Sequence, residues 1–495
     1  MGADQIQIDV DKLMQQITED VADRPLIPIP PPASSIIQQP VQMLVRPSLW
    51  KRAKGRSKRY ALAIARRVKH FGSRARQSLA AKKHKLKAII VQSKPAPPPI
   101  VETPIGSPQP APTPVVEAPI DPFVNRRDSE IRIAVLTPCL VDGDAVGNDV
   151  MGMYHVLMKQ GYVCQIFCDV WTTSAVDVKH ISQIKSFLTK PSDILIYHYS
   201  VGWDAALVPI REIDCKKVIK YHNVTPPQYF ENFNPDYTNV CRAGRAQLQT
   251  IANIPGATYL SDSAYNAGEL LELGVSPENS SVLPPFHHID SLQFTEPDSS
   301  VLSAYHDGKF NILMVGRLAP NKGHAALIEA FHHYYRYYNP NSRLLIVGKA
   351  DPRLDKYSNF LNQKVAELEL ANAVVFTGGV SAEALKSYYL VSHAFMITSD
   401  HEGFCVPLVE AMSIKLPIVA YGSTAIPHTV DKAGLVWSQA DPALLAGSLD
   451  RIATSESVSR QLGQLGWQRY EEVFSNRRIE AKFLQLINHL AVESK

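Results

Sequence analysis

Short apolar runs alternate with amphipathic stretches from residue 131 onward, and this alternation constrains the fold more than any other feature of the chain. Strands are expected near residues 131, 163, 193, 217, 258 and 282 in a first group, and near 310, 343, 373, 394, 417 and 434 in a second. Helical patterns, such as residues 324–335 and 382–390, lie between most of these runs. Strands separated by helices form parallel sheets with helices on both faces. The pattern therefore predicts two α/β halves that face one another across a cleft.

The run HEGFCVPLVE, at residues 401–410, places Glu402 and Glu410 eight positions apart and carries the strongest functional signal. The apolar run at 393–398 predicts a buried strand before it, and residues 407–412 predict a helix with proline in its first turn. Glu410 then lies about one turn into the helix, where it can face the same pocket as Glu402. Its two acceptor oxygens suit the adjacent hydroxyls of a ribose. By itself, the spacing fits two glutamates on solvated faces equally well.

The same loop brings three backbone amides to the start of the predicted helix. They belong to Phe404, Cys405 and Val406. Unsatisfied N–H groups and the helix dipole at such a position favour a diphosphate or a polar sugar.

A second motif, FNILMVGRLAPNKG at residues 310–323, runs from a predicted strand into a glycine and two cations. Gly316 lets the backbone approach a ligand, Arg317 offers a planar fork of donors, and Lys322 adds a compact charge. Alone, this motif also fits surface cations after a strand. Both motifs follow strands of the second group, so we expect their loops at one sheet edge, where they can hold a diphosphate together.

Together, GRLAPNKG and HEGFCVPLVEAM resemble the retaining, nucleotide-sugar-dependent glycosyltransferases of the GT-B fold, family 4. The resemblance implies two Rossmann-like domains, the second of which binds the donor. The family's two acids, separated by seven residues, match Glu402, near the donor sugar, and Glu410, on the donor ribose. The arginine and lysine on its leaving diphosphate match Arg317 and Lys322. Many members have glycine in place of Cys405, which we treat as a minor departure because an amide serves with either side chain.

The loop at residues 137–150, after the first strand, resembles the family's first glycine-bearing loop, near the donor phosphate and the acceptor. Gly147 is its best match. Asp142 and Asp144 have the Asp-x-Asp form that another glycosyltransferase fold uses to hold a metal, but they follow the first strand of a Rossmann-like half, which is the wrong context. The predicted cations and helix N-terminus supply positive charge. We therefore expect no catalytic metal and no cofactor beside the donor substrate.

Two predicted strands of the first half, at 193–198 and 217–222, end in histidine. In related enzymes, a histidine after the second of these strands contacts the transferred sugar, so the match is His222. The alternative is a histidine that bonds its own loop. His198 is expected to be structural. The segment YHNVTPPQYF, from Tyr221, resembles a subgroup associated with bacterial envelope polysaccharides.

Residues 1–125 differ from the rest in composition. They contain half of the 36 prolines, which favour extended linkers. Residues 41–90 contain 16 Lys plus Arg and no acid, so the net charge of +4 combines a basic segment with an acidic body. Apolar residues recur there at three- and four-residue steps, and the resulting amphipathic helix would suit an anionic membrane or an envelope-assembly partner. A solvated basic tail is the main alternative, and nucleic-acid binding is the least favoured.

These patterns divide the chain into four parts. We expect a disordered or helical N-terminal extension at 1–125, a Rossmann-like acceptor-side domain at 126–305 and a Rossmann-like donor-binding domain at 306–470. The resemblance implies that a final helix, at 471–495, packs back toward the first domain. Within the extension, apolar residues from Val10 to Val21 form a short helical stripe that either docks on a partner or frays.

Three absences complete the prediction. The sequence shows no 18-residue apolar run and no secretory leader, so we expect a cytoplasmic protein, with peripheral contact at the inner face of the membrane through its basic segment. The six cysteines form no CxxC pair and are expected to be reduced thiols.

The combined hypothesis is a hexosyltransferase of cell-envelope polysaccharide synthesis. It transfers a mannose- or glucose-type sugar from a nucleoside diphosphate to a glycan or lipid-linked acceptor, with retention. Arg317, Lys322 and the loop amides stabilise the leaving diphosphate, while His222 and Glu402 orient the sugar in a cleft that excludes water. The alternatives are a GT-B epimerase or phosphorylase, and a non-catalytic scaffold with a basic arm. The nucleotide, hexose, acceptor and linkage stay open.

Overall fold

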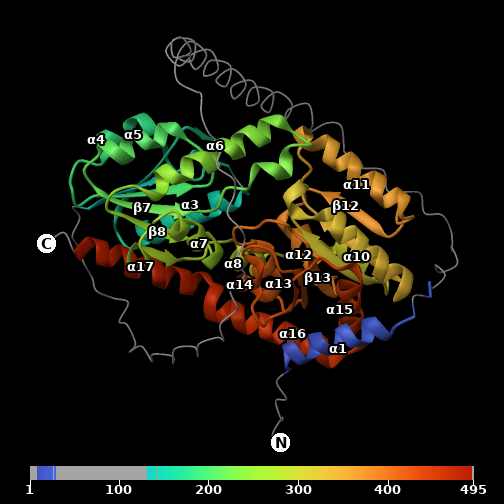
Figure 1. Cartoon of the computed structure of the whole chain (residues 1–495). Coiled ribbons are helices and arrows are strands. Elements are labelled where there is room, and N and C mark those ends of the chain that lie inside the picture. The colour runs from blue at the N-terminus through green and yellow to red at the C-terminus, as the bar shows by residue number, and fades with distance from the viewer. Residues whose placement is uncertain (1–7, 26, 29–130, 142, 493–495) are drawn as a thin grey trace, which may run out of the picture. The chain divides into compact units, whose positions relative to one another are not determined.

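A computed structural model describes residues 8–25, 27–28, 131–141 and 143–492 (Figure 1). All of these residues belong to one compact unit, which comprises Met1–Ala33 and Arg126–Lys495. The basic segment at 41–90 and most of the proline-rich stretches lie outside the described residues. The membrane-binding prediction for them therefore stays a prediction.

The first half is built on a seven-stranded parallel sheet. Its strands occur in the order β5 (Val178–His180), β3 (Val163–Cys168), β1 (Arg132–Leu136), β6 (Ile194–Tyr199), β7 (Lys216–Tyr221), β8 (Ala257–Ser261) and β9 (Ser280–Val282). The helices are α3 (Ala145–Lys159), α4 (Ile184–Phe187), α5 (Asp204–Glu212), α6 (Pro235–Ala252) and α7 (Ala264–Glu272). Helices cover both faces, so all six residues of β6 are buried and its sequence is almost continuously apolar.

The second half has a six-stranded parallel sheet. Its order is β12 (Val374–Gly378), β11 (Ser342–Val347), β10 (Phe310–Val315), β13 (Ala394–Ile397), β14 (Ile418–Tyr421) and β15 (Leu435–Trp437). Its helices include α10 (His324–Tyr337), α11 (Asp355–Glu367), α12 (Ala382–Leu390), α13 (Val406–Ser413), α14 (Ile426–Val430), α15 (Pro442–Thr454) and α16 (Glu456–Arg469). The strand order reverses between the neighbours β10 and β13. A reversal of this kind opens a ligand crevice at the carboxyl ends of the strands.

The two doubly wound sheets confirm the predicted GT-B architecture, and all twelve expected strands are present. The sequence prediction missed β5 and the two-residue strands β2 (Cys139–Leu140) and β4 (Val170–Trp171), which pair with each other. Runs of two or three residues are too short to show a periodicity.

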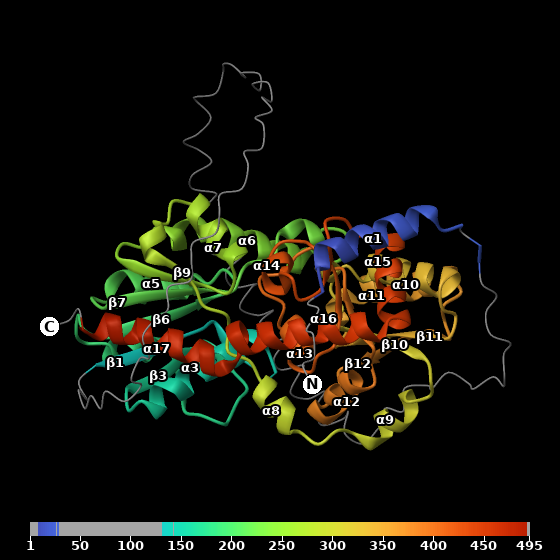
Figure 2. The same cartoon turned by 90° about the horizontal axis from the view of Figure 1, so that it is seen from below.

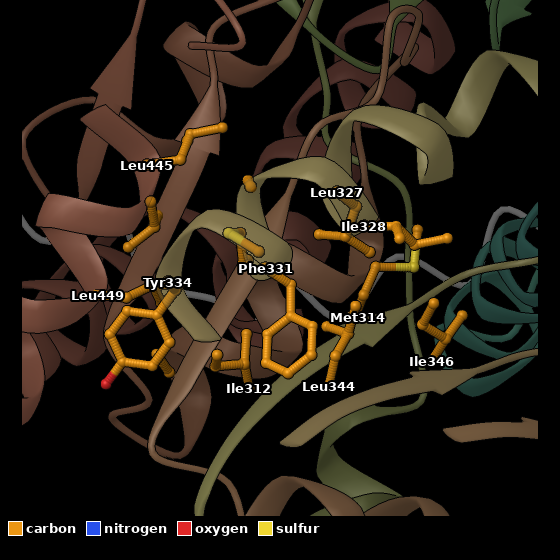
Figure 3. Close-up of a cluster of buried hydrophobic side chains, with 14 of the residues drawn as sticks. Ile312, Met314, Leu327, Ile328, Phe331, Tyr334, Leu344, Ile346, Leu445 and Leu449 are labelled. Atoms are coloured by element: carbon orange, nitrogen blue, oxygen red, sulfur yellow. The ribbon is translucent and has the colours of Figure 1, made fainter. Parts of the chain in front are cut away.

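One hydrophobic core of the second half lies between its sheet and the helices α10 and α15. Figure 3 shows side chains of β10 and β11 packed against those of both helices. Ile312, Leu344 and Phe331 are fully buried there. This core fixes the position of β10, and so of the loop that follows it.

The predicted N-terminal stripe forms the helix α1 (Val10–Asp23), which packs on α15 of the same chain (Figures 1 and 2). Ile17 is 1% exposed and belongs to the core of the second half. Gly447 of α15 makes room for α1, because a Cβ there would lie 2.6 Å from a methyl group of Val21. Arg451 also pairs with Asp20. The helix therefore docks within the compact unit, although we expected residues 1–125 to form a separate extension.

Two further helices connect the halves. The helices α8 (Ile289–Phe294) and α9 (Ser299–Tyr305) pack on the second core, so the boundary predicted at residue 305 lies beyond two helices of the second half. After a π-helical turn at Tyr470–Phe474, α17 (Asn476–Val492) returns to α3 and the first core, as predicted (Figure 2).

Within the described part of the chain, we find no helix with the length and apolar character needed to span a membrane. All six cysteines are free thiols, as expected, and five of them are buried.

Candidate active site

The loops that follow β10 and β13 carry the two predicted motifs, and the structure brings these loops into backbone contact. Gly323 ends the first loop with a φ of 63°, and a Cβ there would lie 1.8 Å from the Thr398 carbonyl oxygen. The Thr398 hydroxyl donates to the Gly323 carbonyl oxygen at 2.9 Å. Gly316 was predicted to let the backbone approach a ligand. A Cβ at this position would meet only the flexible end of the Met314 side chain. The glycine that this geometry requires is therefore Gly323.

Lys322 and Glu402 form an ion pair between the two loops, and their predicted contacts with the diphosphate and the sugar stay predictions. The Lys322 Nζ lies 2.8 and 2.7 Å from the two carboxylate oxygens of Glu402, whose side chain is 6% exposed. Thr424, in the loop after β14, accepts a hydrogen bond from the Glu402 amide at 2.9 Å and donates one to its carbonyl oxygen at 3.0 Å. The prediction missed Thr424, because no motif marks its loop.

The helix α13 begins at Val406, next to the predicted proline, with Cys405 as the N-cap residue. The side chains of Phe404 and Cys405 are buried in the second core. Cys405 has φ 74° and ψ 73°, in the left-handed region that favours glycine. The replacement of glycine by Cys405 is therefore a conformational departure and not a minor one. Whether these amides hold a ligand stays a prediction.

Glu410 lies in α13 and has a different partner from Glu402. The hydroxyl of Tyr389, in α12, donates to its Oε2 atom at 2.6 Å. Burial raises the pKa of the Glu410 carboxyl above its usual range, although the Tyr389 hydrogen bond opposes this shift. The hydrogen bond fixes one carboxylate oxygen, and the contact with a ribose stays a prediction.

Arg317 is exposed and turns toward the first half. Its Nη1 atom lies 3.3 Å from the hydroxyl of Tyr237, in α6. The same hydroxyl donates to Asp351 at 2.5 Å and accepts from Arg353 at 2.8 Å. Burial acts to raise the pKa of Asp351, but hydrogen bonds from Arg353 and Tyr237 hold it below its usual range. Arg317 and Lys322 thus lie in one loop with different partners, and Tyr237 links the arginine to the opposite half.

His401 connects the second motif to the first half. Its Nε2 atom lies 2.8 Å from the Oδ1 atom of Asn223, which follows β7. The Asn223 amide nitrogen donates to Asn266 and Glu269 at 2.9 and 2.8 Å, so the Asn223 amide oxygen faces His401. Because this oxygen can only accept a hydrogen bond, the Nε2 atom of His401 carries the proton. Burial and then the nearby cations Arg245 and Lys322 lower the pKa of His401 to about 4, so the ring is neutral near pH 7.

The loop of His222 and Asn223 also touches the second motif through its backbone. A Cβ on Gly403 would lie 2.7 Å from the carbonyl oxygen of His222. Asn223 has a φ of 75°. The sequence prediction missed the pair of Asn223 and His401, because the two residues are far apart in the chain and their contact depends on packing between two distant loops.

The His222 side chain points into a buried cluster of ionisable groups. Its Nδ1 atom lies 2.9 Å from Asp262, and its Nε2 atom lies 2.9 Å from the Nδ1 atom of His198. Lys220 pairs with Asp262 at 2.6 Å, and Asp149 lies 3.6 Å from both histidines. Burial lowers the pKa of His198 well below its usual range and raises that of Asp149. Both ring nitrogens of His222 thus have partners inside the first half, and its contact with a transferred sugar stays a prediction.

Asp149 was not predicted, although the sequence contains a signal for it. In α3 it precedes Met153 and Val156 by four and seven positions, which places a carboxylate on the apolar face of the helix. Gly147 lies in the first turn of this helix, where a Cβ would lie 2.9 Å from the Val141 carbonyl oxygen. Asp144 caps the same turn by accepting from the Gly147 amide at 3.3 Å. Asp144 therefore has a structural role, and Asp142 lies outside the described residues.

Comparisons with known proteins relate the second half of the chain to a family. Residues 301–469 match the model of the family glycosyl transferases group 1. The MMP alpha-(1->4)-mannosyltransferase of Mycolicibacterium hassiacum is 29% identical over 227 residues, which are 45% of this chain and 52% of that protein. The amylovoran biosynthesis glycosyltransferase AmsD of Erwinia amylovora is 24% identical over 187 residues, or 38% and 49% of the two chains. The chain thus matches about half the length of these relatives.

Solved structures agree on the fold. Alr3699/HepE of Anabaena, in complex with UDP and glucose, has a TM-score of 0.55 and 16% identity, and the match covers 72% of this chain and 99% of that one. The two doubly wound sheets and this likeness show the GT-B fold, and the family match of the second half supports a glycosyltransferase.

Proposed function

We propose that the protein is a retaining hexosyltransferase that takes a mannose- or glucose-type sugar from a nucleoside diphosphate donor. The acceptor in this proposal is a glycan or a lipid-linked glycan of a cell-envelope polysaccharide. The observation that carries the proposal is the junction of the two motif loops, where Lys322 and Glu402 pair beside the N-terminus of α13. The names of the relatives, a mannosyltransferase and a polysaccharide-biosynthesis glycosyltransferase, support the choice of sugar and pathway.

The proposed chemistry follows from the charges at this junction. When the bond between the sugar and the phosphate breaks, negative charge grows on the diphosphate, and positive charge grows on the sugar ring. Lys322, Arg317 and the amides at the start of α13 stabilise the diphosphate, because they are fixed before the reaction begins. The Glu402 carboxylate pairs with Lys322 and, in this proposal, stabilises the cationic sugar ring. No step requires a metal at the diphosphate.

The opposite wall of the site comes from the first half. Gly403 packs against the His222 carbonyl oxygen, and His401 binds Asn223, so the loop that carries Glu402 lies directly on the acceptor-side half. A sugar held at this contact is shielded from water, which would otherwise hydrolyse the donor. In the proposal, the acceptor hydroxyl reaches the sugar from the first half, near Gly147 and the start of α3. A cytoplasmic location with contact to the inner membrane face is part of the same proposal.

Donor binding and turnover test the proposal directly. GDP- and UDP-linked mannose, glucose and N-acetylglucosamine are added separately to the purified full-length chain, and its melting temperature is measured. A donor that binds only the folded state raises this temperature. We expect one nucleotide series to do so, and NMR of the product to show the anomeric configuration of the donor. The proposal fails when no donor is bound or turned over, or when the anomeric centre is inverted.

Variants separate the donor site from general stability. Arg317→Ala and Glu410→Gln each remove a proposed contact between a charged side chain and the nucleotide-sugar. We expect each variant to lower kcat/KM roughly 10- to 100-fold. Arg460→Ala and Glu367→Gln are the matched controls, because both side chains are exposed on helices and, among the described residues, bond to a residue of their own helix. Unchanged turnover in Arg317→Ala and Glu410→Gln would refute the proposed roles of these residues.

A further inference from the structure

Five ionisable side chains are buried together at the carboxyl ends of β6, β7 and β8, in the first half. They are Asp149, His198, Lys220, His222 and Asp262, and none of their side chains is more than 6% exposed. Burying charges costs several kcal/mol per ion, and such clusters contribute little to stability on balance. Their retention inside a folded protein therefore indicates a specific task.

Three atoms of this cluster form a triangle. The Nδ1 atom of His198 and the Nε2 atom of His222 are 2.9 Å apart, and the Oδ2 atom of Asp149 lies 3.6 Å from each. A point that is about 2.0–2.1 Å from all three atoms exists just outside their plane, and this is the length of Zn–N and Zn–O bonds. The edges also resemble those of a tetrahedron around zinc, which are about 3.3 Å at that bond length. We propose that Asp149, His198 and His222 are three ligands of a structural zinc ion.

The surroundings of Asp149 and His222 match those of known zinc ligands, whereas the Nε2 atom of His198 is buried without a hydrogen-bond partner among the described residues. The Nδ1 atom of His222 lies 2.9 Å from the Asp262 carboxylate, which orients the ring and leaves Nε2 directed at the triangle. A metal-bound histidine typically donates its other N–H to a carboxylate in this way. The second oxygen of Asp149, Oδ1, accepts a hydrogen bond from the Phe286 amide at 2.8 Å. Both Asp149 and His222 are thus held with one donor atom toward the same point.

Charge and hydrogen bonding support a cation there. When both carboxylates are ionised and both imidazoles are neutral, Asp149, Asp262 and Lys220 give the cluster a net charge of −1, which attracts a cation; a zinc ion would bring it to +1. A proton on one imidazole would bring it to zero and is the competing explanation. Such a proton satisfies the contact between the two histidines. The buried Oδ2 atom of Asp149 then has ion-pair distances of 3.6 Å to each histidine and 3.9 Å to Lys220, but no hydrogen bond from a described residue. A metal ion satisfies all three atoms at once.

The ion would fix the wall of the candidate active site without taking part in the reaction. Its ligands come from α3, β6 and the loop after β7, and the last of these carries the His222 carbonyl oxygen against Gly403. Because the cluster is buried, the ion would be taken up during folding and would not bind substrate. Two imidazoles and one carboxylate form a donor set that favours zinc over the hard, octahedral cations.

Metal analysis of the wild-type chain tests the proposal. Full-length protein is purified without a metal-affinity tag, dialysed against chelator-treated buffer and analysed by plasma mass spectrometry. We expect about one zinc ion per chain, because structural sites bind tightly. Removal of zinc by 1,10-phenanthroline should lower the melting temperature, and added zinc should restore it. Cobalt substituted for zinc should give the visible absorption bands of a four-coordinate ion.

Asp149→Asn and His198→Gln should reduce the zinc content to background. His180→Gln is the matched control, since it removes a histidine that pairs with an aspartate at the surface of the same half. It should keep the full zinc content. The proposal is overturned when the wild-type chain contains no stoichiometric zinc, gains none on incubation with the ion and keeps its melting temperature in chelator; the cluster is then balanced by a proton. The wild-type measurement decides the question even when a variant does not fold.

Discussion

At the scale of single residues, Cys405 adopts a backbone conformation that most side chains avoid. Its φ of 74° places it in the left-handed region, at the turn that starts α13. For an L-residue with a Cβ, this conformation costs roughly 1–2 kcal/mol. Strain of this kind persists only where the surrounding structure enforces it, and it often marks a functional turn. Here the turn directs the backbone from Glu402 into the helix that carries Glu410.

The Cys405→Gly variant should therefore be more stable than the Cys405→Ala variant. This reverses the usual order inside helices and strands, where alanine is more stabilising than glycine. The relief of left-handed strain exceeds the entropic cost of glycine by roughly 0.5–1 kcal/mol. The free energies of unfolding of Cys405→Gly and Cys405→Ala, measured in urea, give this difference directly, because both variants lose the same sulfur atom. Ala411, buried in the same helix, is the control position, and Ala411→Gly should be less stable than the wild type. A Cys405→Ala variant more stable than Cys405→Gly would contradict the argument.

The sequence indicated that the loops of the two motifs would meet at one sheet edge, and the structure brings them together there. Lys322 and Glu402 each lie in a motif at the end of a strand, and their pairing follows from the strand order. His401 and Thr424 were not predicted, because their partners are set by packing between distant loops. The buried surroundings of His222 were not predicted either, since they depend on three separate elements that meet only in the folded chain.

At the scale of elements, the strands were predictable because burial on both faces demands continuous apolar runs, as in β6 and β11. Helix existence was equally clear, and α12 has the predicted bounds, Ala382–Leu390. The periodicity of apolar residues did not predict which surface an amphipathic helix packs against. α1 has an apolar stripe that fits a partner protein as well as its own chain. The structure places α1 on α15, where the absence of a side chain at Gly447 leaves room for Val21.

Ile17→Asp should detach α1 from the second half. Ile17 is 1% exposed, and a carboxylate there cannot be buried without a partner. The cost is limited to the docking free energy, roughly 2–3 kcal/mol, because the helix can leave the surface. Hydrogen exchange measured by mass spectrometry should show lost protection in residues 10–23 and faster exchange in α15. Gln16→Asp, at an exposed position of the same helix, should leave both unchanged. Unaltered protection of α1 in Ile17→Asp would show that docking does not depend on this stripe.

At the scale of the whole molecule, the two halves meet through side chains that also hold candidate site residues. Aromatic residues of the first half, such as Phe230, pack into the core of the second half beneath β10. Tyr237 then reaches Arg317, and Asn223 reaches His401. Under the proposed function, a donor bound by the second half and an acceptor bound by the first would therefore be coupled through Tyr237 and Asn223. Contacts of this kind would link the position of the two halves to completion of the site.

The hydroxyl of Tyr237 should matter for donor binding more than for the fold, given the proposed function. Tyr237→Phe keeps the ring but removes the hydrogen bonds to Arg317, Arg353 and Asp351. Arg317 then loses its fixed position, and we expect the KM for the donor to rise roughly ten-fold, which corresponds to about 1.4 kcal/mol. Tyr229→Phe is the matched control, because it removes a hydroxyl that reaches the second half at the Asp400 carbonyl oxygen without touching an arginine. Steady-state kinetics with varied donor, and melting temperatures of both variants, separate the two effects. If Tyr229→Phe raised the KM as much as Tyr237→Phe, the effect would come from a general loosening of the two halves and not from the position of Arg317.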